Sequence, residues 1–112
     1  TITGLIEASH PQQQVLGFSA LKGDFLNEEV AKLTTKRNWS ILDDYCCGGY
    51  AKTTPELIQF IQHFEAEYDI PLEQIYTGKM LLGISDLIKT GYFPAEKKLL
   101  ILHTGGLQGR NI

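Results

Sequence analysis

Short apolar segments alternate with amphipathic ones along most of this chain. Three runs have the length and composition of buried strands, namely Val15–Leu21, Trp39–Leu42 and Lys98–His103, and the last is the clearest of them. A short extended piece is expected at Gln74–Tyr76. Because helical spacing separates these segments, the pattern predicts an α/β fold, a three-layer αβα arrangement with a mostly parallel sheet.

The intervening helices are predicted from apolar periodicity and from capping residues. Asp24–Lys36 places its leucines and a valine on one face. Thr54 followed by Pro55 is a typical helix start, and Pro71 ends the pattern that begins there. In Lys79–Thr90 apolar residues cover much of the circumference, so this helix is expected to be buried on more than one side, with a left-handed glycine just after it.

The length of 112 residues suits one small domain, but the strand-and-helix pattern is incomplete at its amino end. Thr1–Glu7 has helical spacing with no strand before it to pack beside. Four strands also make a thin parallel sheet, since such folds commonly need about 150 residues or more. We therefore expect this chain to be part of a larger α/β domain.

Composition and charge exclude several classes of function. With 43% apolar and 21% charged residues the chain is an ordinary globular one, and its net charge of −3 gives no basic surface for nucleic acid. It has no apolar run of about 18 residues and no secretory pattern, so we expect neither a membrane partner nor export. The expected location is cytoplasmic. Cys46 and Cys47 are adjacent, which is expected of bystander thiols rather than of a metal site.

Three polar turns with glycine follow the predicted strands. They are Tyr45–Tyr50, Tyr76–Lys79 and His103–Gly106. Ligands of parallel sheets bind at the carboxyl ends of strands, where hydroxyls and backbone amides of such turns can meet an anion or a ring. Each turn alone is weak evidence, because a Gly-Gly after a strand is more often a requirement of the turn.

Taken together, two of these turns resemble a known family. The run Tyr76-Thr77-Gly78-Lys79-Met80, followed by an apolar helix, then Leu99–Leu102 and His103-Thr104-Gly105-Gly106, resembles the carboxyl-terminal end of D-cysteine desulfhydrases and 1-aminocyclopropane-1-carboxylate deaminases. Thr1–Ile6 and Asp43–Glu56 are similar to further segments of that family. It belongs to the tryptophan-synthase-β-like, fold-type-II enzymes that use pyridoxal 5'-phosphate. The resemblance implies that residues 1–112 are the carboxyl-terminal part of the large cofactor-binding domain of a homodimer.

The resemblance also implies which residues meet cofactor and substrate. Thr77 would face the pyridine nitrogen, with Thr104 and Gly105 on the same side of the ring and Thr1 in the phosphate cradle. Tyr76 and Tyr50 would be the catalytic tyrosines, which orient the substrate or move a proton. The alternative for Tyr76 is an aromatic packed in the core at a strand end, and the correspondence of Tyr50 is looser.

The implied reaction is β-elimination or deamination of a small amino acid. A threonine hydroxyl at Thr77 cannot stabilise a pyridinium as a carboxylate would, which gives a weaker electron sink suited to β-elimination. Members that open the cyclopropane ring typically carry glutamate at the position of Thr77 and leucine at that of Thr104. We therefore expect a lyase of the desulfhydrase branch that releases sulfide, pyruvate and ammonia from a substrate such as D-cysteine, with the deaminase as the alternative.

Other residues with chemical potential are expected to be structural. Lys79 stands in the strongest motif, but the family places its cofactor-anchoring lysine in the amino-terminal region, outside this sequence. His103 is expected to satisfy a hydrogen bond at a strand end. Two other classes remain open: a binding module that holds a phosphate-containing ligand without chemistry, and a receiver-like domain suggested by Asp43 and Asp44 after a strand.

Overall fold

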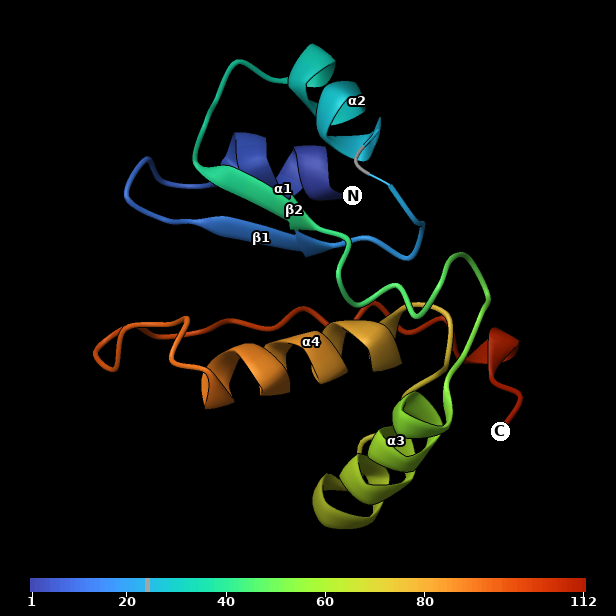
Figure 1. The fold of residues 1–112 in the computed structure, drawn as a ribbon. Helices are drawn as coiled ribbons and strands as arrows, with labels where there is room; N and C mark the ends of the chain where they lie inside the picture. The colour runs from blue at the N-terminus through green and yellow to red at the C-terminus, as the bar shows by residue number, and fades with distance from the viewer. Residues whose placement is uncertain (24) are drawn as a thin grey trace.

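The computed structural model describes residues 1–23 and 25–112 and shows helices alternating with strands as far as β2, followed by helices alone (Figure 1). In order these are α1 (Ile2–Ala8), β1 (Val15–Phe18), α2 (Phe25–Leu33), β2 (Trp39–Leu42), α3 (Pro55–Tyr68), α4 (Thr77–Lys89) and a short 3-10 turn, η1 (Leu107–Gly109). Asp24, the expected first residue of the second helix, lies outside the described residues. The predicted α/β class is confirmed.

The two strands pair in parallel, as the alternation of strands and helices requires. Val15 is opposite Trp39 and Phe18 is opposite Leu42. The first strand is shorter than predicted. Its pairing ends at Ser19, whose amide donates to Leu42 O at 2.7 Å and whose hydroxyl turns back to bond the backbone of Leu21.

Helices cover both faces of this small sheet. Neighbouring residues of a strand point to opposite faces. A Cβ added at Gly17 would lie 2.5 Å from Ile2 of α1. The ring of the next residue, Phe18, packs against Gly83 of α4, where an added Cβ would lie 2.5 Å from it. Helix α1 therefore lies on one face and α4 on the other, and α2 is on the side of α1 (Figure 1). This is the three-layer arrangement that the pattern predicted.

The buried core lies mainly between α3 and α4. Leu57 and Ile61 of α3 contact Leu72 and Leu81, and all four are buried. The start of α3 is the predicted one, because the Thr54 side chain accepts a hydrogen bond from the Leu57 amide at 3.1 Å. Removing these leucines and this isoleucine from water is the main stabilising contribution in this half of the molecule.

Two strand predictions are wrong. Gln74–Tyr76 forms a turn, so α4 begins at Thr77 and not at Lys79. Lys98–His103 is extended but unpaired, and Leu100 is fully exposed. A strand needs a neighbour for its backbone donors and acceptors, and the sheet formed by the described residues has β1 and β2 alone.

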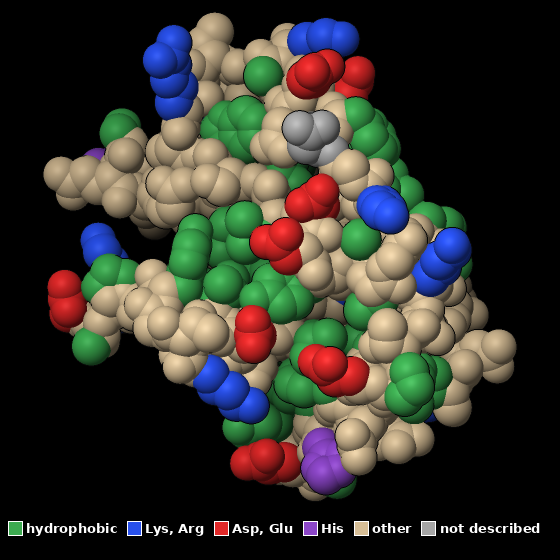
Figure 2. Space-filling model, in the orientation of Figure 1, with side chains coloured by type: hydrophobic (Ala, Val, Ile, Leu, Met, Phe, Trp, Pro, Cys, Tyr) green, Lys and Arg blue, Asp and Glu red, His purple; other side chains and the backbone are tan. Residues whose placement is uncertain are grey.

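Helix α4 also differs from its prediction in its second half. Leu81 and Ile84 are buried, but Ile88 near its end is 56% exposed. The expected glycine cap is present, since Gly91 has a φ of 77° and the Tyr92 amide donates to Leu87 O at 3.0 Å. On the face shown in Figure 2 acidic and basic side chains are scattered among hydrophobic ones. Within residues 1–23 and 25–112, no helix has the length and apolar character to cross a bilayer.

Candidate functional site

A pair of tyrosines lies at the start of helix α4. Tyr50 ends the glycine-containing loop after β2, and Tyr76 is the residue before the first turn of α4. Their hydroxyl oxygens are 2.9 Å apart, and their rings meet edge to face with centroids 6.0 Å apart. Both side chains remain about half exposed. The structure thus brings the two predicted catalytic tyrosines together on an accessible surface.

The environment of Tyr76 keeps its phenol protonated. The hydrogen bond with Tyr50, partial burial and the negative charge of Glu73 all raise the pKa of Tyr76 above its ordinary value. Each of these effects favours the neutral phenol over the ionised one. At neutral pH Tyr76 therefore holds its proton, and either hydroxyl of the pair can be the donor of their shared hydrogen bond.

Contacts to α4 hold the loop that carries Tyr50. Tyr45 at its start donates to Asp86 at 2.5 Å and packs its ring on Phe18. Near its end Gly49, with a φ of 139°, accepts a hydrogen bond at its carbonyl from the Lys79 ammonium at 3.0 Å. The loop is therefore fastened to the same helix that Tyr76 begins.

A buried carboxylate organises the residues around Tyr76. Glu73 Oε1 accepts from the amides of Tyr76 and Thr77 at 2.8 and 2.6 Å. Its Oε2 accepts from the Ile75 amide at 2.6 Å. Amides at the start of a helix have no partner within the helix, and a negative charge is stabilised there. Sequence reasoning missed this role, although an acidic residue just before a helix start was the available signal.

Thr77 is buried and its hydroxyl is engaged with Glu73. Thr77 Oγ1 accepts from the Glu73 amide at 3.1 Å and donates to Glu73 Oε1 at 3.2 Å. The second of these contacts is weak, and Oε1 keeps two backbone donors without it. Next to Thr77, Gly78 is required by packing, because an added Cβ would lie 2.5 Å from the Glu73 carbonyl oxygen and 2.6 Å from Ile61.

The segment with Thr104 and Gly105 is fastened to the residues that precede α4. The Gly105 amide donates to His103 Nδ1 at 3.0 Å, so the proton of that ring is on Nε2, 2.9 Å from Pro71 O. Further along, Gln74 Nε2 donates to Gly109 O at 2.8 Å. Thr104 itself is exposed. His103 makes hydrogen bonds with the backbone, which is the structural role expected of it.

Thr1 lies at the start of α1 and not beside the tyrosines in sequence or fold. Helix α1 begins on the side toward which both strands point (Figure 1), where ligands of parallel sheets bind. The Thr1 side chain is exposed and makes no capping hydrogen bond. The structure places Tyr50, Tyr76 and Thr77 in one cluster. The roles assigned to these three residues and to Thr1, Thr104 and Gly105 all stay predictions.

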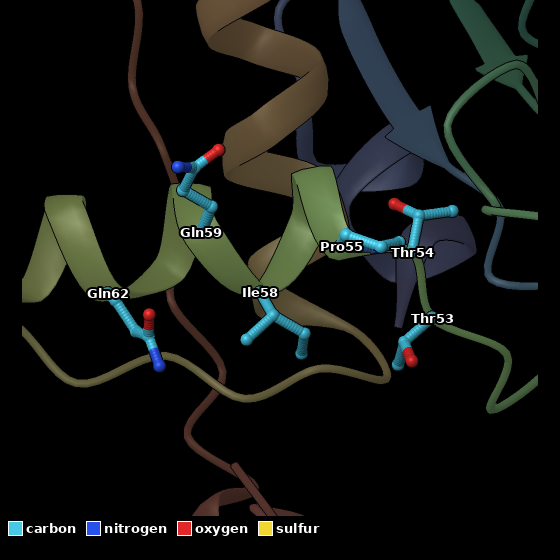
Figure 3. A pocket seen from close by; sticks show the side chains of 6 residues that line it. All are labelled: Thr53, Thr54, Pro55, Ile58, Gln59 and Gln62. Atoms are coloured by element: carbon cyan, nitrogen blue, oxygen red, sulfur yellow. The ribbon is translucent and has the colours of Figure 1, made fainter.

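An open groove lies elsewhere on the molecule. It has a volume of about 580 Å³ and is lined by residues at the start of α3 (Figure 3), namely Thr53, Thr54, Pro55, Ile58, Gln59 and Gln62. Its polar groups are the uncharged hydroxyls and side-chain amides of threonine and glutamine, and none of the predicted site residues lines it.

Comparison with protein-family models finds no match. A 1-aminocyclopropane-1-carboxylate deaminase of Bradyrhizobium sp. strain BTAi1 is 34% identical over 71 residues, 63% of this chain and 21% of that protein. A D-cysteine desulfhydrase of Klebsiella pneumoniae strain 342 is 29% identical over 112 residues, 90% of this chain and 34% of that protein. The crystal structure of an ACC deaminase homologue matches with a TM-score of 0.70 at 26% identity, over 84% of this chain and 31% of that one. The chain therefore spans a fifth to a third of the length of these relatives.

Proposed function

We propose that this chain, which belongs to the family of 1-aminocyclopropane-1-carboxylate deaminases and D-cysteine desulfhydrases, supplies the catalytic tyrosines of a pyridoxal-phosphate-dependent enzyme. The substrate is a small amino acid such as D-cysteine, and the products are sulfide, pyruvate and ammonia. The observation that carries this proposal is the contact between Tyr50 and Tyr76, whose hydroxyl oxygens are 2.9 Å apart. Residues 1–112 are then the carboxyl-terminal part of the cofactor-binding domain, in a cytoplasmic homodimer.

The side chains of the cluster suit pyridoxal phosphate. To face a ring nitrogen, the buried Thr77 hydroxyl would have to turn from Glu73 and become accessible; Oε1 would keep its bonds to the amides of Tyr76 and Thr77. Thr104 offers a hydroxyl on an exposed turn, and the amide of the left-handed Gly105, with a φ of 82°, already donates to His103 Nδ1. An added Cβ at Gly105 would meet nothing within 4 Å, so the turn has room for a ring beside it. When bound, the cofactor withdraws electrons from the amino acid carbon that loses its proton.

The tyrosine pair then binds and orients the substrate. Either hydroxyl can donate across the 2.9 Å contact, and the phenol that accepts keeps its own proton free to point outward. An outward O–H can bind a carboxylate or protonate a departing sulfur atom. The raised pKa of Tyr76 keeps that phenol neutral, so it does not repel an anionic substrate.

Threonine at two positions favours sulfide release over ring opening. A hydroxyl at Thr77 would leave the pyridine nitrogen of a bound cofactor largely unprotonated, and Thr104 stands where ring-opening members typically carry leucine. The second candidate is the deaminase itself. It is favoured by the 34% identity to the Bradyrhizobium protein of that name.

The test uses the purified full-length protein. We expect a visible absorbance band from bound cofactor and sulfide release from D-cysteine, with little ammonia released from 1-aminocyclopropane-1-carboxylate. Tyr76→Phe and Tyr50→Phe should each lower turnover by about 10²-fold or more. Tyr68→Phe is the matched control, because Tyr68 is equally exposed but lies on α3.

Other outcomes would replace the proposal. Ammonia from the cyclopropane substrate without sulfide from D-cysteine would favour the deaminase. A colourless protein that binds phosphate-containing ligands and turns over neither substrate would favour a binding module. Unchanged turnover in both tyrosine variants would remove the tyrosine pair from the mechanism.

A further inference from the structure

Two charged side chains are almost completely buried beneath the tyrosine pair. Glu73 and Lys79 are each 1% exposed; Glu73 precedes α4 and Lys79 lies in its first turn. Burying a charge costs several kcal/mol unless it is well hydrogen-bonded. Apolar residues of similar volume would fill the same space at lower cost. Their partners therefore indicate what these two charges do.

Lys79 bonds to the residue beside Tyr50. Its ammonium donates to the Gly49 carbonyl at 3.0 Å, which joins α4 to a loop 30 positions earlier in the chain. Gly49 is buried and has a left-handed φ of 139°. Since Tyr50 follows directly, the position of the Gly49 peptide sets the position of the Tyr50 backbone, from which its side chain extends.

Glu73 plays the corresponding part for Tyr76. Its carboxylate accepts from the Tyr76 amide at 2.8 Å and from the two amides on either side of it. Three bonds to consecutive amides fix the backbone of this turn. Each tyrosine is thus held through its backbone by one buried charge.

We infer that Lys79 and Glu73 are positioning residues that hold Tyr50 and Tyr76 in contact. Lys79 sets the loop and Glu73 sets the helix start, so the distance between the two hydroxyls depends on both. This inference rests on the proposed function for the catalytic meaning of the pair, but the contact itself is measurable without turnover. It gives Lys79 a purpose other than anchoring a cofactor.

The experiment follows the titration of Tyr76 by NMR in the full-length protein labelled at the tyrosine ζ-carbons. Tyr76→Phe assigns the signal, and the charged or titratable groups that face Tyr76 are Tyr50 and Glu73. Lys79→Met should lower the pKa of Tyr76 toward its ordinary value, because the hydrogen bond to Tyr50 is lost. Turnover should fall about a hundredfold, the usual effect of a displaced catalytic group. Lys89→Met, on the exposed end of the same helix, should change neither.

A double-variant cycle separates positioning from general destabilisation. In the Tyr50→Phe background there is no hydroxyl contact left to lose, so Lys79→Met should leave the Tyr76 titration unchanged. Lys79→Gln, which is too short to reach Gly49, serves if the methionine variant does not fold. If the pKa of Tyr76 in both folded Lys79 variants equals that in the parent, the inference is wrong. Glu73→Gln should also lower the pKa of Tyr76.

The two proposals fail in different ways. If the titrations behave as expected but the parent releases no sulfide, the proposed function is wrong and the positioning role stands. If Tyr76→Phe lowers turnover but Lys79→Met changes neither turnover nor titration, the positioning role alone is wrong.

Discussion

The hydroxyl of Tyr45 donates a hydrogen bond to the carboxylate of Asp86 at 2.5 Å, and this contact ties the loop after β2 to the middle of α4. The hydrogen bond with Asp86 raises the pKa of Tyr45 to about 12, with smaller contributions from burial and from the charges of Asp86 and Asp44. Each of these effects favours the neutral phenol, because ionisation would place a second negative charge beside Asp86.

Replacing Asp86 should return Tyr45 to ordinary behaviour. In Asp86→Asn we expect the pKa of Tyr45 to fall from about 12 toward 10. Tyrosinate absorbance measures this, with Tyr45→Phe to identify the signal. The control is Asp69→Asn, an exposed aspartate after α3. A Tyr45 midpoint that stays near 12 in Asp86→Asn would show that the hydrogen bond does not form.

The same shift predicts how stability depends on pH. The folded-state pKa of Tyr45 lies above its ordinary value of 10.0, so its contribution is fully present below pH 10 and is lost as pH rises toward about 12. The parent should therefore lose more stability than Tyr45→Phe across this window. Denaturant unfolding at several pH values measures the difference.

Gly78 should not tolerate a side chain. In Gly78→Ala the new methyl group would lie 2.5 Å from the Glu73 carbonyl oxygen and 2.6 Å from Ile61, so backbone must move. We expect a loss of about 1–3 kcal/mol in the free energy of unfolding. Gly4→Ala is the matched control within a helix, because its Cβ would meet nothing within 4 Å. That variant should gain up to about 1 kcal/mol from helix propensity.

Features set by neighbours in the sequence were predictable, and those set by distant contacts were not. The cap of α3 follows from Thr54 and Pro55 alone, and β2 was predicted at its observed bounds. The contact between Lys79 and Gly49 joins residues 30 positions apart. The role of Glu73 depends on a turn that brings the amides of residues 75–77 to its carboxylate, and the apolar periodicity of the sequence does not predict this turn.

Thr77→Glu tests the electronics of the proposed site in the full-length enzyme. A carboxylate facing the pyridine nitrogen would strengthen the electron sink and should slow sulfide release from D-cysteine by roughly tenfold, about 1.4 kcal/mol in the barrier. It should also change the visible spectrum of the bound cofactor. Stability should fall as well, because Thr77 Oγ1 is 3.2 Å from Glu73 Oε1, so turnover is compared per folded protein.

Thr77→Ser is the control, since it keeps the hydroxyl. It should retain parental turnover and spectrum. If Thr77→Glu also keeps both, Thr77 does not face the cofactor nitrogen, and the preference for sulfide release loses its support.

The segment at Lys98–His103 shows why composition alone can mislead. Its run of leucine and isoleucine is typical of a central strand, because such apolar side chains are stable when they are buried. Pairing is a separate requirement that only a neighbouring strand can meet. Within residues 1–23 and 25–112 no strand lies beside this segment, so its apolar side chains remain exposed, Leu100 completely.

This exposed segment should make the 112-residue chain self-associate when it is expressed alone. Contiguous apolar residues in an extended, unpaired segment are a template for pairing with another chain. In Leu100→Lys we expect less association by sedimentation and no loss of helical circular dichroism, because Leu100 makes no buried contact to lose. Gln108→Lys adds the same charge to an exposed position of the carboxyl-terminal segment without removing an apolar side chain. Equal effects of the two variants would assign the change to net charge. Loss of helical signal in Leu100→Lys alone would mean that Leu100 is buried, as the sequence pattern predicted.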